Sequence, residues 1–97
     1  MAVWSGQITV ATAGTAVAGP DVVGQAFLFT PHPSNAGGFV WIGNDGEGDI
    51  DTGSGFPLSA DQVTGIEAAA PNAGINLSLL RFDVTTSGDK ICWLRIR

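Results

Sequence analysis

Short apolar runs separated by turn-forming residues dominate the chain from residue 26 to residue 96. The separators are clusters of glycine, proline, asparagine, serine and aspartate, such as residues 33–38 and 85–89. Short strands alternating with turn signals are typical of an all-β sandwich or barrel. The pattern therefore predicts a single antiparallel β-sandwich or jelly-roll-like domain of about seven to eight short strands. The apolar runs lie at residues 26–29, 39–42, 76–82 and 90–94.

The first strongly apolar strand is expected at residues 22–30. Because side chains alternate along a strand, Phe27 and Phe29 share one face and Ala26 and Leu28 share the other. Both sets are apolar, which leaves open that both faces of this strand are covered.

A second apolar strand is expected at residues 39–43. If Val40 and Ile42 face the core, Trp41 points outward and becomes a candidate contact residue. The alternative is that Trp41 packs beneath a loop.

Turn-forming residues predict a loop and a hairpin. Residues 31–38 are expected to form a loop, because the two prolines lack ladder donors and the glycines favour tight turns. Residues 77–84 and 90–96 are expected to pair as a hairpin through residues 85–89, a length typical of hairpin loops.

The N-terminal segment is rich in small residues. Residues 3–10 and 15–17 read as two strands, although their alternation is weak. Residues 1–19 are therefore expected to form either an edge strand or an assembly arm that becomes ordered on a neighbour.

Length and composition limit the chain to one domain, residues 1–97. Its 97 residues, 44% of them hydrophobic, support one modest core, so oligomerisation would add stability. Fourteen glycines and 13% charged residues disfavour helix, since an interior glycine costs roughly 1 kcal/mol relative to alanine.

The net charge of −5 argues against direct nucleic-acid binding, which needs clustered lysine and arginine. The four basic residues fall in the last seventeen residues and the acids cluster near the middle, an asymmetry that could orient contacts between subunits. The alternative is that both groups are solvated surface charges.

The chain begins without a basic, apolar leader, and no stretch approaches the length of a membrane span. A soluble product made inside the cell, with no membrane partner, is expected. The single cysteine, Cys92, cannot form an internal disulfide and is expected to be a buried thiol.

The acidic residues Asp45, Glu47, Asp49 and Asp51 alternate along one loop and could supply oxygens to calcium. The run departs from an EF-hand loop, because Ile50 stands at the sixth position and Phe56 at the twelfth. A solvated acidic loop without a cofactor is the favoured interpretation.

No cluster of catalytic residue types is present. His32, the only histidine, lies between Pro31 and Pro33 and is expected on a surface loop. A Ser-His-Asp set with Asp21 or Asp45 is formally conceivable, but no Gly-x-Ser-x-Gly motif accompanies it. The chain is expected not to be an enzyme.

The aromatic residues offer another alternative, a sugar-binding face built from ring planes. The competing interpretation is that most of them belong to the core and the rest lie at subunit contacts. The residues concerned are Trp4, Phe39, Trp41, Phe56 and Trp93.

Several short segments follow one another in an order that is similar to that of a known group of proteins. An apolar strand leads into a Pro-x-Asn-x-Gly turn, a strand ending in glycine, a Gly-x-Pro-Leu segment and a closing hairpin around Ser-Gly. The segments are residues 27–29, 33–37, 40–43, 52–58, 76–78 and 86–94. This series, over residues 22–96, resembles small virion structural proteins of tailed bacteriophages.

The resemblance implies a non-enzymatic β-sandwich on the virion. Its expected role is a capsid cement or decoration protein on the outer capsid surface, made in the host cytoplasm, with the major capsid protein and its own copies as partners. A trimer is the favoured homo-oligomer. The alternatives are a tail or baseplate component and a glycan-binding module. The expected partner-contact residues are Trp4, Pro31, His32, Pro33, Trp41, Arg95 and Arg97.

Overall fold

The computed structural model describes residues 4–44, 55–68 and 74–97. Over these residues the regular elements are β-strands, apart from one short 3-10 helix, η1, which confirms the all-β prediction. In chain order the elements are β1 Ser5–Thr9, β2 Val17–Ala18, β3 Val23–Gly24, β4 Ala26–Pro31, β5 Phe39–Asn44, β6 Phe56–Ser59, β7 Thr64–Glu67, β8 Ile75–Asn76, η1 Leu77–Leu79, β9 Leu80–Val84 and β10 Lys90–Arg95.

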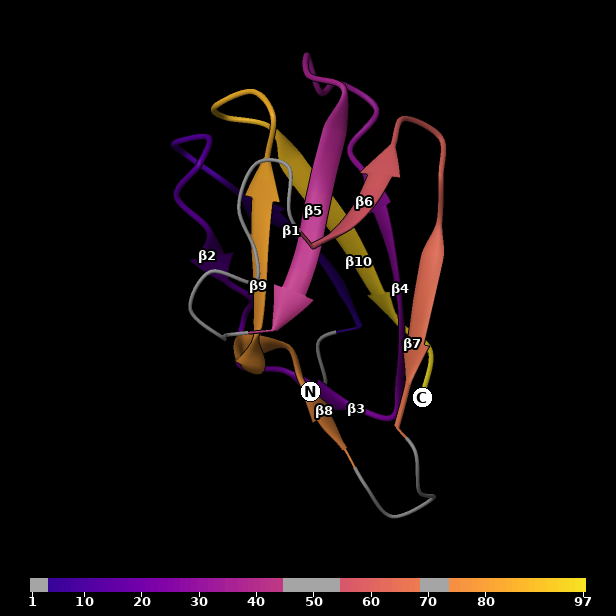
Figure 1. Ribbon diagram of the computed structural model, residues 1–97. Coiled ribbons are helices and arrows are strands. Elements are labelled where there is room, and N and C mark those ends of the chain that lie inside the picture. The colour runs from indigo at the N-terminus through magenta and orange to yellow at the C-terminus, as the bar shows by residue number, and fades with distance from the viewer. Residues whose placement is uncertain (1–3, 45–54, 69–73) are drawn as a thin grey trace.

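The strands form two four-stranded antiparallel sheets and a small ribbon. Sheet A has the strand order β1-β10-β4-β7, and sheet B has the order β2-β9-β5-β6. Figure 1 shows β5 and β9 of sheet B in front of β10 and β4 of sheet A, with the β3–β8 ribbon below both. The edge strands are β1 and β7 in sheet A and β2 and β6 in sheet B.

The core lies between the two sheets. Phe27 and Phe29 are buried from sheet A, as their shared face in the sequence predicts, and Phe82 is buried from sheet B. The rings of Phe29 and Phe82 meet across the interface with centroids 5.7 Å apart. The buried apolar set is Ile8, Val10, Phe27, Phe29, Val40, Ile42, Leu58, Leu77, Phe82, Val84, Ile91 and Trp93.

The expected C-terminal hairpin does not form. β9 pairs with β2 and β5 in sheet B, whereas β10 pairs with β1 and β4 in sheet A. Residues 85–89 therefore carry the chain from one sheet to the other. They are held by long-range bonds instead of hairpin bonds, because the amide of Val10 donates to Asp89 O and the amide of Gly88 donates to Val10 O.

Two expected strands are also divided. The predicted strand 22–30 splits into β3 and β4, because the chain changes partners at Gln25, whose amide donates to Arg97 O at 2.6 Å. The predicted strand 77–84 starts with η1, because the Asn76 side chain accepts from the amide of Ser78 and caps a short turn. β9 begins only at Leu80.

Residues 5–9, expected as an edge strand or an arm, form β1 at the edge of sheet A. They pair with β10 from Ser5 opposite Leu94 to Thr9 opposite Lys90. This part of the N-terminal segment therefore belongs to the sandwich itself.

Two buried aspartates form hydrogen bonds to loops at the end of the sandwich where the chain passes from β9 to β10. The Asp89 carboxylate accepts from the amides of Ala36 at 3.0 Å and Gly37 at 2.7 Å. Asp83 accepts from the amide of Gly14 at 3.0 Å. These bonds satisfy both the buried carboxylates and the loop amides, which would otherwise lie unpaired.

Candidate functional site

An apolar exposed surface lies on the side of sheet A that faces away from the core. Its residues come from three neighbouring strands, since Leu28 of β4 lies opposite Leu94 of β10 and Thr30 lies opposite Cys92. Val63, just before β7, completes the group. We call these five residues, Leu28, Thr30, Val63, Cys92 and Leu94, the outer face of sheet A. They surround a shallow hollow of about 210 Å³, floored by Phe29 and Trp93.

The outer face of sheet A combines an apolar centre with a charged border. Leu94 is 46% exposed and Val63 is 62% exposed, so two large apolar side chains face solvent. On one side lies Lys90, and on the other Arg97 and Glu67 form an ion pair of 3.2 Å. Protein interfaces share this anatomy of an apolar core depleted in charge and a polar rim.

Cys92 belongs to this face and is not in the core, which corrects the prediction of a buried thiol. It alternates with the buried Ile91 and Trp93 and is half-buried on the opposite side of β10. Desolvation raises the pKa of the Cys92 thiol, and the nearby Lys90 charge acts in the opposite direction.

Trp4 and Arg95 come together at one end of sheet A. The amide of Arg95 donates to Trp4 O, and the Arg95 guanidinium carbon lies 4.6 Å from the centroid of the Trp4 ring. This is a cation–π distance. Trp4 is 48% exposed, whereas Arg95 Nε is buried with no hydrogen-bond partner among the residues described.

The segment 31–33 lies at the other end of β4. Pro31 was expected in a loop, but it is the buried last residue of β4 and pairs with Ile91. The position tolerates proline because it ends the strand. His32 is half-buried and Pro33 is exposed. His32 Nδ1 accepts from the amide of Ser34 at 3.0 Å and lies 2.7 Å from Ser34 Oγ, so this pair closes a local turn.

Trp41 lies on the outer side of sheet B, as its alternation with the buried Val40 and Ile42 predicts. Its ring and that of Phe39 have centroids 5.6 Å apart with an interplanar angle of 35°. Pro57 of β6 is its cross-strand neighbour. Phe39 is 44% exposed, so this aromatic pair is accessible from solvent.

The structure therefore distributes the predicted contact residues over three places. Trp4, Arg95 and Arg97 lie at one end of sheet A, residues 31–33 lie at the other, and Trp41 lies on sheet B. The five-residue aromatic set is likewise divided, because Trp93 is in the core and only Phe39 and Trp41 pair on the surface.

Sequence reasoning did not select the outer face of sheet A as a contact surface. The signal was present, because Leu28 makes β4 apolar on both sides and Leu94 does the same for β10. A strand that is apolar on both faces either lies inside two layers or offers one face to a partner.

The structure bears on metal binding and membrane spans only for the residues that it describes. Over residues 4–44, 55–68 and 74–97, no group of three or more His, Cys, Asp or Glu side chains is placed to hold a metal ion. The calcium candidates at residues 45–51 lie outside these ranges. Within the same part of the chain, no helix has the length and apolar character needed to cross a bilayer.

Asp21 is one of the two aspartates that the sequence allows in a Ser-His-Asp set with His32. In the structure its carboxylate accepts a hydrogen bond from the Asn76 side chain at 2.7 Å.

Comparisons of the chain with protein-family models, with curated proteins and with solved structures found no match.

Proposed function

We propose that the chain is a non-enzymatic virion structural protein, a capsid cement or decoration protein that binds the outer shell of a tailed bacteriophage. It would act as a homo-oligomer, with a trimer favoured, and the major capsid protein would be its partner. The motif order described above motivates the choice of a virion, and the surface chemistry of sheet A supports a docking role.

The observation that carries the proposal is the outer face of sheet A. Leu28, Val63 and Leu94 present apolar area on a rigid sheet, where little conformational entropy is lost when a partner binds. The surrounding charges, Lys90 and the Glu67–Arg97 pair, would fix the orientation of the partner. A stable interface needs on the order of 800 Å² from each partner. Neighbouring residues such as Ile96, which is 47% exposed, would extend the contact toward that size.

The direct test is co-sedimentation of the purified protein with mature heads of the encoding virus, stripped of accessory proteins. Stoichiometry is read on a quantitative gel. We expect saturable binding at a fixed number of copies per capsid protein, and that ratio indicates the oligomer. Failure to saturate intact heads would contradict the cement role, and binding to purified tails in the same assay would favour a tail or baseplate component.

Two leucine variants test which surface binds. Leu94→Asp places a charge at the centre of the outer face of sheet A and should weaken head binding about tenfold or more, because the charge must be desolvated. Leu79→Asp is the control, since Leu79 is 61% exposed on η1, away from that face. Equal binding by the two variants would exclude this face as the docking surface.

Glycan recognition is a second candidate function, favoured by the Phe39–Trp41 pair on sheet B. Flat aromatic surfaces stack on sugar rings, and here two rings lie together beside Pro57. Binding to a glycan array that is lost in Trp41→Ala and retained in Trp4→Ala would support this function. An array without signal at high protein concentration would remove it.

A further inference from the structure

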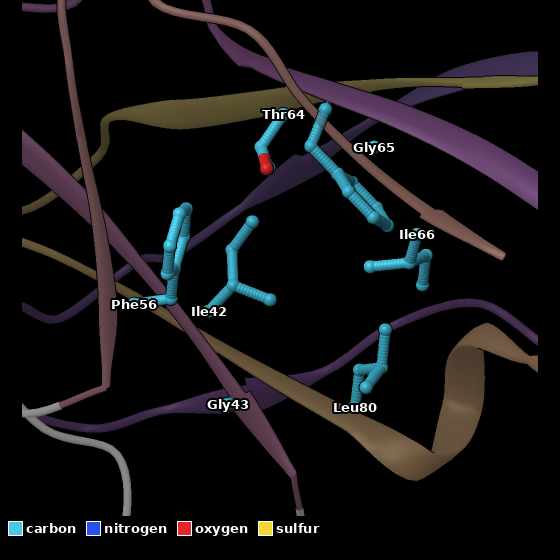
Figure 2. A pocket seen from close by; sticks show the side chains of 8 residues that line it. Ile42, Gly43, Phe56, Thr64, Gly65, Ile66 and Leu80 are labelled. Atoms are coloured by element: carbon cyan, nitrogen blue, oxygen red, sulfur yellow. The ribbon is translucent and has the colours of Figure 1, made fainter.

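A second hollow lies between the two sheets and has a different character. Its volume is about 330 Å³, and its lining comes from β4 and β7 of sheet A and from β5, β6 and β9 of sheet B. Figure 2 shows the side chains of Ile42, Phe56, Ile66 and Leu80 arranged around it. Phe56 is 55% exposed at its border, so the hollow is reached from the side where the edge strands β6 and β7 lie. Phe29, Gly43, Thr64 and Gly65 complete the lining.

Among the described residues that line the hollow, Thr64 supplies the one side-chain hydroxyl. It pairs with the inward-facing Phe29 and therefore points between the sheets, and Figure 2 shows its oxygen directed toward the hollow. Within the part of the chain that the structure describes, no hydrogen bond engages this hydroxyl. The eight lining residues include no charged side chain.

Water is a poor occupant of such a space. Water that enters from the open side gains one hydroxyl from the described lining side chains, so little of its hydrogen bonding comes from the protein. An apolar molecule that displaces this water gains dispersion contacts with the lining and breaks few hydrogen bonds to the protein. The volume falls at the lower end of small-molecule sites, which span roughly 300–1,000 Å³.

We propose that this hollow is a binding site for a small uncharged molecule that has one or two aromatic or aliphatic rings and carries one hydrogen-bonding group. The apolar walls from Ile42, Ile66 and Leu80 hold the ring, and Thr64 bonds to its polar group. None of the described lining residues carries a charge, so these residues offer no partner to a carboxylate, a phosphate or an amine that is desolvated on binding.

The probes are toluene and p-cresol, which differ by one hydroxyl. They are titrated into the full chain labelled at its isoleucine and leucine methyl groups, and binding is followed by methyl chemical shifts. We expect saturable shifts at Ile42, Ile66 and Leu80 with one common dissociation constant, and tighter binding of p-cresol. Thr64→Val should weaken p-cresol binding by about 2- to 10-fold, the range for one hydrogen bond, and leave toluene binding unchanged.

Two phenylalanine variants of the same edge region distinguish binding in the hollow from unspecific binding to apolar surface. Ile66→Phe extends the inward side chain into the hollow and should abolish binding of both probes. Val63→Phe adds the same ring on the outer face of sheet A and should leave the hollow and its affinities unchanged. Thermal unfolding of each variant establishes that it is folded before the titrations are compared.

Several outcomes would overturn the proposal. One is the lack of saturable shifts up to the solubility limit of both probes. Another is equal shifts at Leu28 and Leu94, which would show unspecific binding to apolar surface. A third is methyl shifts at Ile42, Ile66 and Leu80 that depend on protein concentration without any probe, which would assign the hollow to a side chain of a second copy.

Discussion

The indole of Trp93 lies directly on Gly6, its partner in the pairing of β10 with β1. A Cβ atom added at Gly6 would lie 2.9 Å from Trp93 Nε1 and 3.0 Å from Cε2 and Cζ2. Trp93 also packs edge-on against Phe27, with ring centroids 6.2 Å apart. The missing side chain at Gly6 is therefore what allows a large indole to close this side of the core.

Gly6→Ala is expected to destabilise the fold by about 1–3 kcal/mol, because the indole must shift in a well-packed core. Urea unfolding followed by circular dichroism measures the change. Gly38→Ala is the matched control, since nothing lies within 4 Å of a Cβ there and its φ is not positive. That variant should be neutral or more stable by up to about 1 kcal/mol. Equal stability of the two variants would show that Trp93 adapts without cost.

Asp89 is expected to contribute through its two bonds to loop amides. In Asp89→Asn, the side-chain NH2 group cannot accept a hydrogen bond, so the amide of either Ala36 or Gly37 loses its acceptor next to the buried side chain at position 89. We expect a loss of about 1–3 kcal/mol and faster hydrogen exchange at the affected amide. Asp61→Asn serves as the control, because Asp61 is exposed and asparagine tolerates its φ of 69°. Unchanged exchange at both amides would contradict this role.

Cys92 is expected to make the fold less stable in alkali. Burial holds the pKa of its thiol above the ordinary value for cysteine, so the unfolded chain loses this proton at lower pH than the folded chain. Above about pH 9 the unfolded state therefore binds fewer protons, and the free energy of unfolding falls as pH rises. Below that range this thiol contributes no pH dependence.

The measurement for Cys92 is the urea midpoint at pH 8 and pH 10, compared with Cys92→Ser. Lysine and arginine residues are the same in both proteins, so the difference between the two pH dependences isolates the thiol. We expect the wild-type midpoint to fall more steeply than that of the variant. Parallel slopes would mean that the thiol has the same pKa in the folded and unfolded chains.

The local alternation of side chains was sufficient to predict the inside and outside of single strands. Phe27 and Phe29 are buried and Trp41 points away from the core, because burial follows the period of two along a strand. The partners of β9 and β10 could not be obtained in this way, because these two strands do not pair with each other and lie in different sheets. A hairpin and a crossing between sheets have the same local pattern of two apolar strands around a turn, and only distant contacts such as Asp89 with Ala36 distinguish them.

The candidate surfaces were predicted less well than the strands for a related reason. Trp4 and Arg95 were both predicted to contact a partner, yet their stacking on each other depends on the register of β1 with β10. The sequence could not place Leu28 or Leu94, because an apolar side chain that faces a second layer and one that faces solvent are identical in sequence. The apolar hollow between β6 and β7 depends on the spacing of two sheets, which no local pattern encodes.

The stacking of Arg95 on Trp4 is expected to stabilise the end of sheet A. A double-mutant cycle with Trp4→Leu and Arg95→Met keeps apolar bulk at both positions and removes the ring and the charge. We expect a coupling free energy of about 0.5–1 kcal/mol in urea unfolding, the range for a cation–π pair near the surface. Because Trp4 is 48% exposed, water competes for the guanidinium, so a larger coupling is not expected. Additive effects of the two single variants would show that the proximity of 4.6 Å contributes nothing to stability.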